Sequence, residues 1–199
     1  MTNTADPEIP MKRTVSLLVL LPVMVACSPE KPTTDPSPSA PPVTSIAPTS
    51  TSVDPSQDPL YLEAVSVYKA YHAELARFEA ASYADGKLPA SIQQYITGSL
   101  LEAVQNSIAE SIRMDEAPKQ GDSTRLTAIA PNIGTSRAGS LVSVRVCTDA
   151  RQGTVVKRST GESLGPGVLA YREVYFKRFG GKLKGFVGEA KVVQSCPIK

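Results

Sequence analysis

The cysteine at position 27 stands where an export signal would be cleaved. Lys12 and Arg13 precede an apolar stretch of twelve residues, 14–25, and Ala26 comes directly before Cys27. A cationic start, a short apolar run and a small residue at the cleavage point define a secretory signal. The run is shorter than the roughly 20 residues that a spanning helix needs. We therefore expect cleavage, with the Cys27 thiol available for covalent chemistry at that point.

The segment around Cys27 resembles the lipobox of bacterial lipoproteins. Val25 and Ala26 fit that pattern, and Met24 stands where Leu, Val or Ile is usual. The resemblance implies cleavage after Ala26 and a diacylglycerol thioether on the Cys27 sulfur, with palmitate-type chains. Two acyl chains anchor a protein stably where one is marginal. It therefore implies a lipid-anchored lipoprotein on the extracytoplasmic face of the cell membrane; the alternative is an ordinary signal peptide with an unmodified cysteine.

Residues able to do acid–base chemistry are few. His72 is the only histidine, and its neighbours Ala73 and Glu74 place it at the edge of an apolar helical stripe, which favours a boundary position over a catalytic one. Asp149 follows an apolar segment, where capping a turn is the simpler role. The sequence has no Gly-x-Ser-x-Gly, His-Glu-x-x-His, P-loop or dinucleotide motif. We expect no catalytic residue and no cofactor.

Charge is distributed unevenly along the chain. Residues 58–120 hold five Lys or Arg against nine Asp or Glu, whereas residues 121–199 hold thirteen against five. A basic face outside the cell can attract anionic headgroups or wall polymers, although a solvated sheet face explains the same pattern and is the favoured interpretation. The candidate anionic-partner face comprises Arg172, Lys177, Arg178, Lys182, Lys184 and Lys191.

The chain divides into a signal, a tether and one domain. We assign residues 1–26 to the signal peptide, with translation starting at Met11 because residues 1–10 contain acids but no cation. Residues 27–57 follow as the lipidated cysteine and a tether, of which positions 28–57 hold eight Pro, seven Ser and five Thr. This composition predicts a disordered linker that reaches roughly 90 Å when extended. Residues 58–199 have the length of one domain.

The domain is predicted to begin with helices. Asp58 and Pro59 are residues that open helices, and an apolar stripe runs from there to Phe78. Asp85 and the following glycine should end the first helix. A second helical stretch covers 90–114, broken at Gly98 and restarted by a Ser-x-x-Glu capping box at 99–102.

The second half of the domain is predicted to be strands. Strands are expected at 124–130 and at 141–148, where apolar and polar residues alternate. Residues 154–157 are expected to pair with 141–148 as a hairpin. Strands at 169–179 and 183–194 should be joined by the Gly-Gly turn between them. Helices followed by hairpin-linked strands predict an α+β fold, with the helices packed on one face of an antiparallel sheet.

The same order resembles the NTF2-like cone fold, in particular its small secreted or lipoprotein members in actinobacteria. The matching segments are 68–71 in the first helix, 100–112 in the later helix, the central strand at 144–149, residues 171–179, and the final strand ending at Cys196. The resemblance covers most of residues 58–199. It implies a curved antiparallel sheet with a pocket between the sheet and the helices.

The cysteine count is consistent with an exported domain. If Cys27 is acylated, Cys147 and Cys196 remain as a pair, and an oxidising compartment favours a disulfide between them. Two free thiols are the alternative. The lone histidine and the absence of a Cys-x-x-Cys motif argue against a metal site.

These features favour a non-enzymatic binding or interaction module at the cell surface. Expected partners are the membrane through the anchor, and an envelope protein, a cell-wall polymer or a small apolar ligand; no nucleic acid is expected. One alternative is a cone-fold enzyme, similar to ketosteroid isomerase or scytalone dehydratase, that uses His72 or a pocket carboxylate as its base. Another is a prophage-encoded surface lipoprotein that affects phage entry. Catalysis would require that histidine or an acid to point into an enclosed pocket beside a polar partner.

Overall fold

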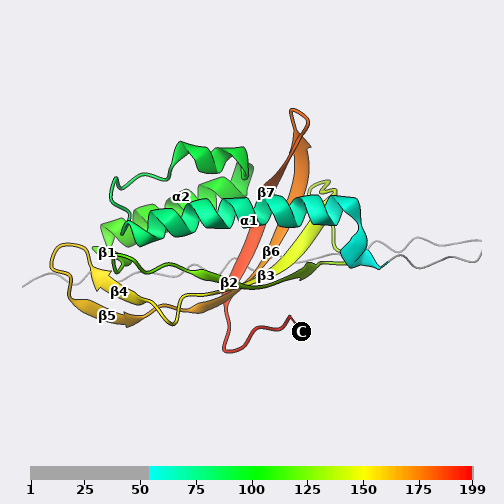
Figure 1. The fold of residues 1–199 in the computed structure, drawn as a ribbon. Helices are drawn as coiled ribbons and strands as arrows, with labels where there is room; N and C mark the ends of the chain where they lie inside the picture. Colours follow the sequence, from blue (N-terminus) through cyan, green and yellow to red (C-terminus); the bar gives the residue numbers. More distant parts are fainter. Residues whose placement is uncertain (1–53, 199) are drawn as a thin grey trace, which may run out of the picture. The chain divides into compact units, whose positions relative to one another are not determined.

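The computed structural model describes residues 54–198 of the chain. The signal segment, Cys27 and tether residues 28–53 lie outside the described residues. Helix α1 (Pro59–Ala80) runs across the large sheet, with α2 (Gly98–Arg113) beside it (Figure 1). The strands are β1 (Glu116–Pro118), β2 (Arg125–Pro131), β3 (Val142–Asp149), β4 (Thr154–Lys157), β5 (Ser163–Pro166), β6 (Leu169–Phe179) and β7 (Lys182–Val192). Within the described residues, no helix has the length and apolar character that crossing a membrane requires.

Helix α1 begins where the sequence predicts and ends earlier. The Asp58 carboxylate accepts hydrogen bonds from the N–H groups of Leu60, at 2.7 Å, and Tyr61, at 3.2 Å. These bonds satisfy two of the donors that the start of a helix leaves free. The helix ends at Ala80, ahead of the predicted stop at Asp85, because the chain then enters the left-handed region of backbone space.

Ordered structure also precedes Asp58. The short 3₁₀ helix η1 (Pro55–Gln57) is capped by Asp54, whose carboxylate accepts a 2.9 Å hydrogen bond from the N–H of Ser56. This turn contacts α1 and β2. Residues that composition assigns to the tether are thus part of the folded unit.

The second helical stretch is divided at Gly98, as predicted, but without a capping box. A 3₁₀ helix, η2 (Ala90–Gln94), comes first, and no side chain caps the start of α2. The hydroxyl of Ser99 instead donates to the Phe186 carbonyl of β7 at 3.3 Å. The backbone around this point is also tied to β7, because the N–H of Thr97 donates to the Gly185 carbonyl at 2.8 Å. The capping-box prediction is therefore wrong: contacts with the sheet hold this helix start.

The large sheet is antiparallel with strand order β2-β3-β6-β7. Its central pair is formed by β3 and β6, with Val144 opposite Val174. The turn at 180–181 joins β6 to β7, as the Gly-Gly pair predicts. Irregular register occurs between β2 and β3 and between β6 and β7. Such bulges bend strands and increase their twist, which accounts for a curved sheet.

A second, smaller sheet has the order β1-β4-β5. Strand β4 pairs with β1, placing Val156 opposite Ala117, and with β5 on its other side. The prediction that β4 returns as the hairpin partner of β3 is therefore wrong. The physical reason is that β2 and β6 already occupy both edges of β3, so its hydrogen-bonding groups have no free side.

The core lies between the helices and one face of the large sheet. Val144 and Val146 of β3 and Val174 and Phe176 of β6 are each at most 2% exposed and belong to one cluster with Tyr68 of α1. Burying side chains of this size contributes roughly 1.5–3 kcal/mol each. The predicted α+β class, with N-terminal helices packed on an antiparallel sheet, is confirmed, and the arrangement is consistent with the NTF2-like cone.

Candidate functional site

A pocket of about 390 Å³ lies between the helices and the β6–β7 half of the large sheet. Its walls are mostly apolar. Leu75 of α1 forms one side, Leu100, Val104 and Ile108 of α2 form another, and Val174 of β6 lies on the sheet side. The size and the apolar lining are those of small-molecule sites in proteins.

Helix α1 supplies the polar groups of one wall. Tyr71, Leu75 and Glu79 lie at steps of four residues and so share one face of the helix, and all three line the pocket. Burial raises the pKa of Tyr71 above its ordinary value of 10. Tyr83, just beyond the helix, also lines the pocket, and burial raises its pKa to about 12. At neutral pH these tyrosines are therefore hydrogen-bonding groups without charge.

Glu79 is a buried carboxylate in this wall, 8% exposed. Its Oε2 accepts a 2.7 Å hydrogen bond from the backbone N–H of Thr124. Burial raises the pKa of Glu79, while the Thr124 bond and the charge of Arg172 act in the opposite direction. The carboxylate thus has a structural task, since it satisfies a backbone donor just before β2.

Arg172 of β6 brings a positive charge to the sheet side of the pocket. Alternation along β6 puts it on the same face as the core residues Val174 and Phe176, and it lines the pocket. Its charge reaches α1: burial raises the pKa of Tyr68 to about 12, and Arg172 partly offsets that rise. A half-buried guanidinium therefore stands between the sheet and α1.

His72 does not line the pocket. It is half-buried at the side of α1, with its ring centroid 6.4 Å from that of Tyr68. Burial, and secondarily the charge of Arg172, lowers the pKa of His72 below its ordinary value of 6.5. The position agrees with the boundary role and gives no support to a catalytic one.

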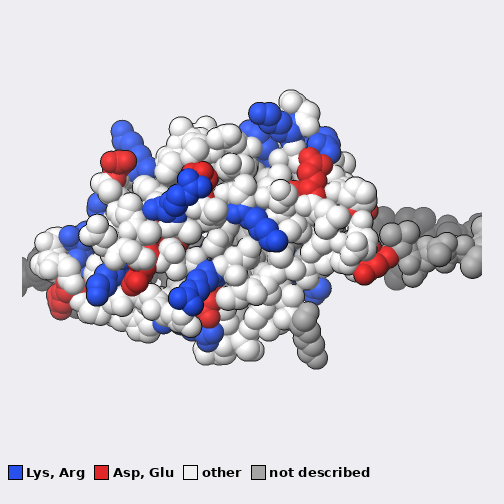
Figure 2. Space-filling view, in the orientation of Figure 1, with Lys and Arg blue, Asp and Glu red and all other residues white. Residues whose placement is uncertain are grey.

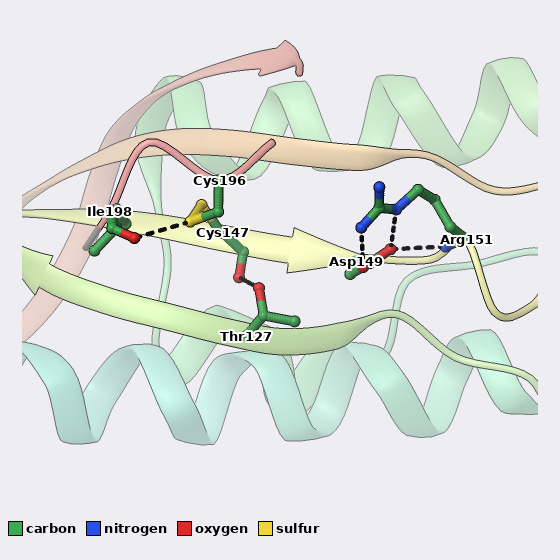
Figure 3. The surroundings of a disulfide bond; sticks show 6 residues. All are labelled: Thr127, Cys147, Asp149, Arg151, Cys196 and Ile198. Carbon is green, nitrogen blue, oxygen red and sulfur yellow. Dashed lines mark hydrogen bonds and ion pairs between the residues drawn. A yellow bond between two sulfur atoms is a disulfide. The ribbon is translucent and has the colours of Figure 1, made fainter. Parts of the chain in front are cut away.

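The disulfide and the turn beside it agree with the sequence analysis. Cys147 of β3 is bonded to Cys196 in the C-terminal segment, with 5.9 Å between their Cα atoms (Figure 3). Asp149 caps the turn after β3, accepting from the N–H of Arg151 at 2.9 Å and from its guanidinium at 2.9 and 2.7 Å. These bonds lower the pKa of Asp149 to about 2. Its lone pairs are engaged in structure, not available as a base.

The predicted basic face does not form a single surface. The side chain of Arg172 is on the pocket side of the sheet, whereas the Nζ of Lys191 lies over the ring of Tyr171, which alternation places on the opposite face. Arg178 pairs with Glu63 of α1 at 2.6 Å. In Figure 2 the basic side chains on the face shown lie apart, with acidic ones among them. The prediction of one face was wrong because neighbouring positions in a strand point to opposite sides.

A further polar cluster lies on the sheet face opposite the helices. The carboxylate of Glu173 accepts from the hydroxyls of Tyr171, at 3.0 Å, and Tyr175, at 2.8 Å, and from the amide of Asn132 at 3.3 Å. These bonds, led by that of Tyr175, lower the pKa of Glu173 against the effect of burial. Both carboxylate oxygens have partners, which identifies the cluster as structural.

Glu79 was not among the residues predicted from the sequence, and Arg172 was predicted to lie on a surface. Both positions carried a signal: Glu79 continues the four-residue steps of Tyr71 and Leu75, and Arg172 falls between Ala170 and Val174 on the apolar side of its strand. Among the described residues, no cluster of three or more metal-ligating side chains occurs.

No family model and no curated protein matches this sequence. Among solved structures, Aln2 from a Streptomyces species is 14% identical, with 67% of this chain and 90% of that chain covered at a TM-score of 0.37. The intermembrane space region of the chloroplast protein ARC6 is 10% identical, with coverages of 64% and 96% and a TM-score of 0.34. A protein of unknown function with a cystatin-like fold from Nostoc punctiforme is 12% identical, with coverages of 68% and 92% and a TM-score of 0.31. Similarity at this level says nothing about the function of this chain.

Proposed function

We propose that this protein is a lipid-anchored lipoprotein of the extracytoplasmic face of the cell membrane, whose domain binds a small ligand without transforming it. The observation that carries the binding role is the pocket of about 390 Å³ between α1, α2 and the sheet. Mostly apolar walls with a few polar groups are the usual composition of a ligand site.

Two features of the chain support the anchor. Lys12 and Arg13, the apolar run and Ala26-Cys27 stand in the order of an export and lipidation signal. The disulfide between Cys147 and Cys196 fits an oxidising compartment, and it leaves Cys27 as the remaining cysteine of the three. A Pro/Ser/Thr-rich tether would then hold the domain away from the membrane.

Binding is favoured over catalysis because the candidate bases have other roles. His72 stands outside the pocket, and Asp149 caps a turn. Glu79 lines the pocket beside a polar partner, as catalysis would require, but one of its oxygens is engaged by the N–H of Thr124. We assign it to holding β2 against α1.

The anchor is tested by replacing the acylated residue. Cys27→Ala should move the protein from the membrane fraction to the soluble extracytoplasmic fraction. The neighbouring Ser28→Ala, which keeps the thiol, is the control and should stay with membranes. Retention of Cys27→Ala in the membrane fraction would refute the anchor.

The pocket is tested with phenylnaphthylamine, a neutral apolar probe whose fluorescence rises in dry sites. Ala103 is exposed and lines the pocket from α2, whereas Ala109 is exposed on the same helix and lies outside it. Ala103→Trp should fill the pocket and abolish the fluorescence increase, while Ala109→Trp should leave it unchanged. Equal probe binding by the two variants would show that this pocket is not the site.

A further inference from the structure

Four charged residues border the pocket, but only two of them direct their side chains to its side of the sheet. The residues are Glu79, Arg172, Glu189 and Lys191. Glu189 and Lys191 lie opposite Glu173 and Tyr171 in the β6–β7 pair, so their side chains are on the other face. Glu79 accepts the 2.7 Å hydrogen bond from the N–H of Thr124. Glu189 forms an ion pair with Arg137, which comes from the loop between β2 and β3. The negative charge of the pocket is therefore engaged by the protein itself.

The two cations differ. The Nζ of Lys191 lies over the ring of Tyr171, 5.2 Å from its centroid. For Arg172, none of the hydrogen bonds or ion pairs among residues 54–198 involves its guanidinium. Residue Arg172 is half-buried and lines the pocket. Its guanidinium keeps some accessible surface, because no fully buried side-chain nitrogen in the described part of the chain lacks a partner.

An unpaired guanidinium in a partly desolvated pocket is a receptor for an anion. Its planar fork can donate two parallel hydrogen bonds to a carboxylate, sulfate or phosphate. Burial costs such a cation hydration, and an incoming anion restores the lost hydrogen bonds. Glu79 stands nearby, but its hydrogen bond to the Thr124 N–H spreads its charge, and burial raises its pKa.

The geometry points to an amphipathic anion as the ligand: a carboxylate, sulfate or phosphate group bound by Arg172, with an apolar body lying against Leu100, Val104 and Ile108 of α2. This inference rests on the proposed ligand-binding role of the pocket and names the chemistry of what enters it. The apolar body accounts for the leucine, valine and isoleucine walls. The anionic head accounts for a charged arginine among them.

A matched pair of probes separates the head group from the body. Anilinonaphthalene sulfonate and phenylnaphthylamine share the same rings and differ by one sulfonate. Binding of both is measured by fluorescence titration with the protein, Arg172→Gln, Arg172→Lys and Lys177→Gln. Arg172→Gln should lower the affinity for the sulfonate probe by about tenfold or more, which is the usual effect of losing a charge-assisted hydrogen bond. It should leave the neutral probe unchanged.

The other variants serve as controls. Arg172→Lys keeps the charge and should retain most of the sulfonate affinity, and Lys177→Gln, an exposed site outside the pocket, should bind both probes normally. Equal melting temperatures would show that Arg172→Gln is folded. Decanoate should displace the sulfonate probe far better than decanamide does.

The outcomes distinguish the two proposals. If Arg172→Gln binds the sulfonate probe as well as the unaltered protein does, the anion inference is overturned. If Ala103→Trp still blocks the neutral probe in that case, the pocket's binding role stands. Failure of the protein to bind either probe would overturn both.

Discussion

Removing the disulfide should destabilise the domain by an amount that its loop length sets. Cys147 and Cys196 are separated by 49 positions. The chain-entropy relation gives about 4 kcal/mol for closing a loop of this size in the unfolded state. With an unfolding entropy of about 2.1 cal/mol/K per residue, this corresponds to a fall in melting temperature of roughly 10–15 °C for this domain.

The assay compares oxidised and reduced protein of identical sequence. Cys27→Ala provides a background in which Cys147 and Cys196 are the only cysteines. Thermal unfolding is followed by circular dichroism with and without reductant, and the double variant Cys147→Ala/Cys196→Ala should melt close to the reduced form. A reductant that lowers the melting temperature by less than about 3 °C would refute the loop-closure reasoning. Two alkylatable thiols in the oxidised sample would refute the bridge itself.

Three further predictions concern titration and packing. Because burial lowers the pKa of His72, stability should fall as pH drops below 6.5, and His72→Gln should flatten that slope in urea unfolding between about pH 7 and about pH 5. Asp149 has its pKa lowered to about 2 by Arg151, so stability should be lost as pH falls from 3.8 toward about 2, and Asp149→Asn should lose less stability over this range than the unaltered protein in acid-unfolding curves. Gly167→Ala should cost about 1–3 kcal/mol, since its Cβ would lie 2.7 Å from the backbone oxygen of Ala150. Gly188→Ala should cost less stability in denaturant melts, because the one tight contact of its Cβ is with the terminal methyl group of Leu100, at 2.6 Å, which can move aside. Equal losses of stability in the two variants would contradict this.

Local signals predicted the two long helices and the four strands of the large sheet, but not β1 or β5 of the smaller sheet, where a loop was expected at 161–167. Asp58-Pro59 marks the start of α1 because capping depends on residues that are adjacent in sequence. Strand β6 falls at the predicted 169–179 and turns at Gly180-Gly181 for the same reason. The pairing of β4 with β1 could not be predicted locally, since it depends on which edges of β3 are already occupied.

The site was harder to predict than the fold. By residue type alone, a glutamate such as Glu79 is expected on the surface. Only its spacing of four residues from Leu75 places it on the buried stripe of the helix. In the sequence, Arg172 is one of several neighbouring cations. Alternation along β6 places it on the opposite face of the sheet from Lys177. Whether a charge has a partner depends on loops and helices far away in sequence, as the ion pair of Arg137 with Glu189 illustrates.

The central claim, that the pocket holds an amphipathic ligand at the cell surface, is tested most directly by native mass spectrometry of the mature protein purified from its own envelope. We predict one small anionic molecule retained per chain, present in Ala109→Trp and absent from Ala103→Trp. The claim would be contradicted if both tryptophan variants carried the small molecule equally. It would also be contradicted if the unaltered protein carried no small molecule and failed to bind the neutral probe.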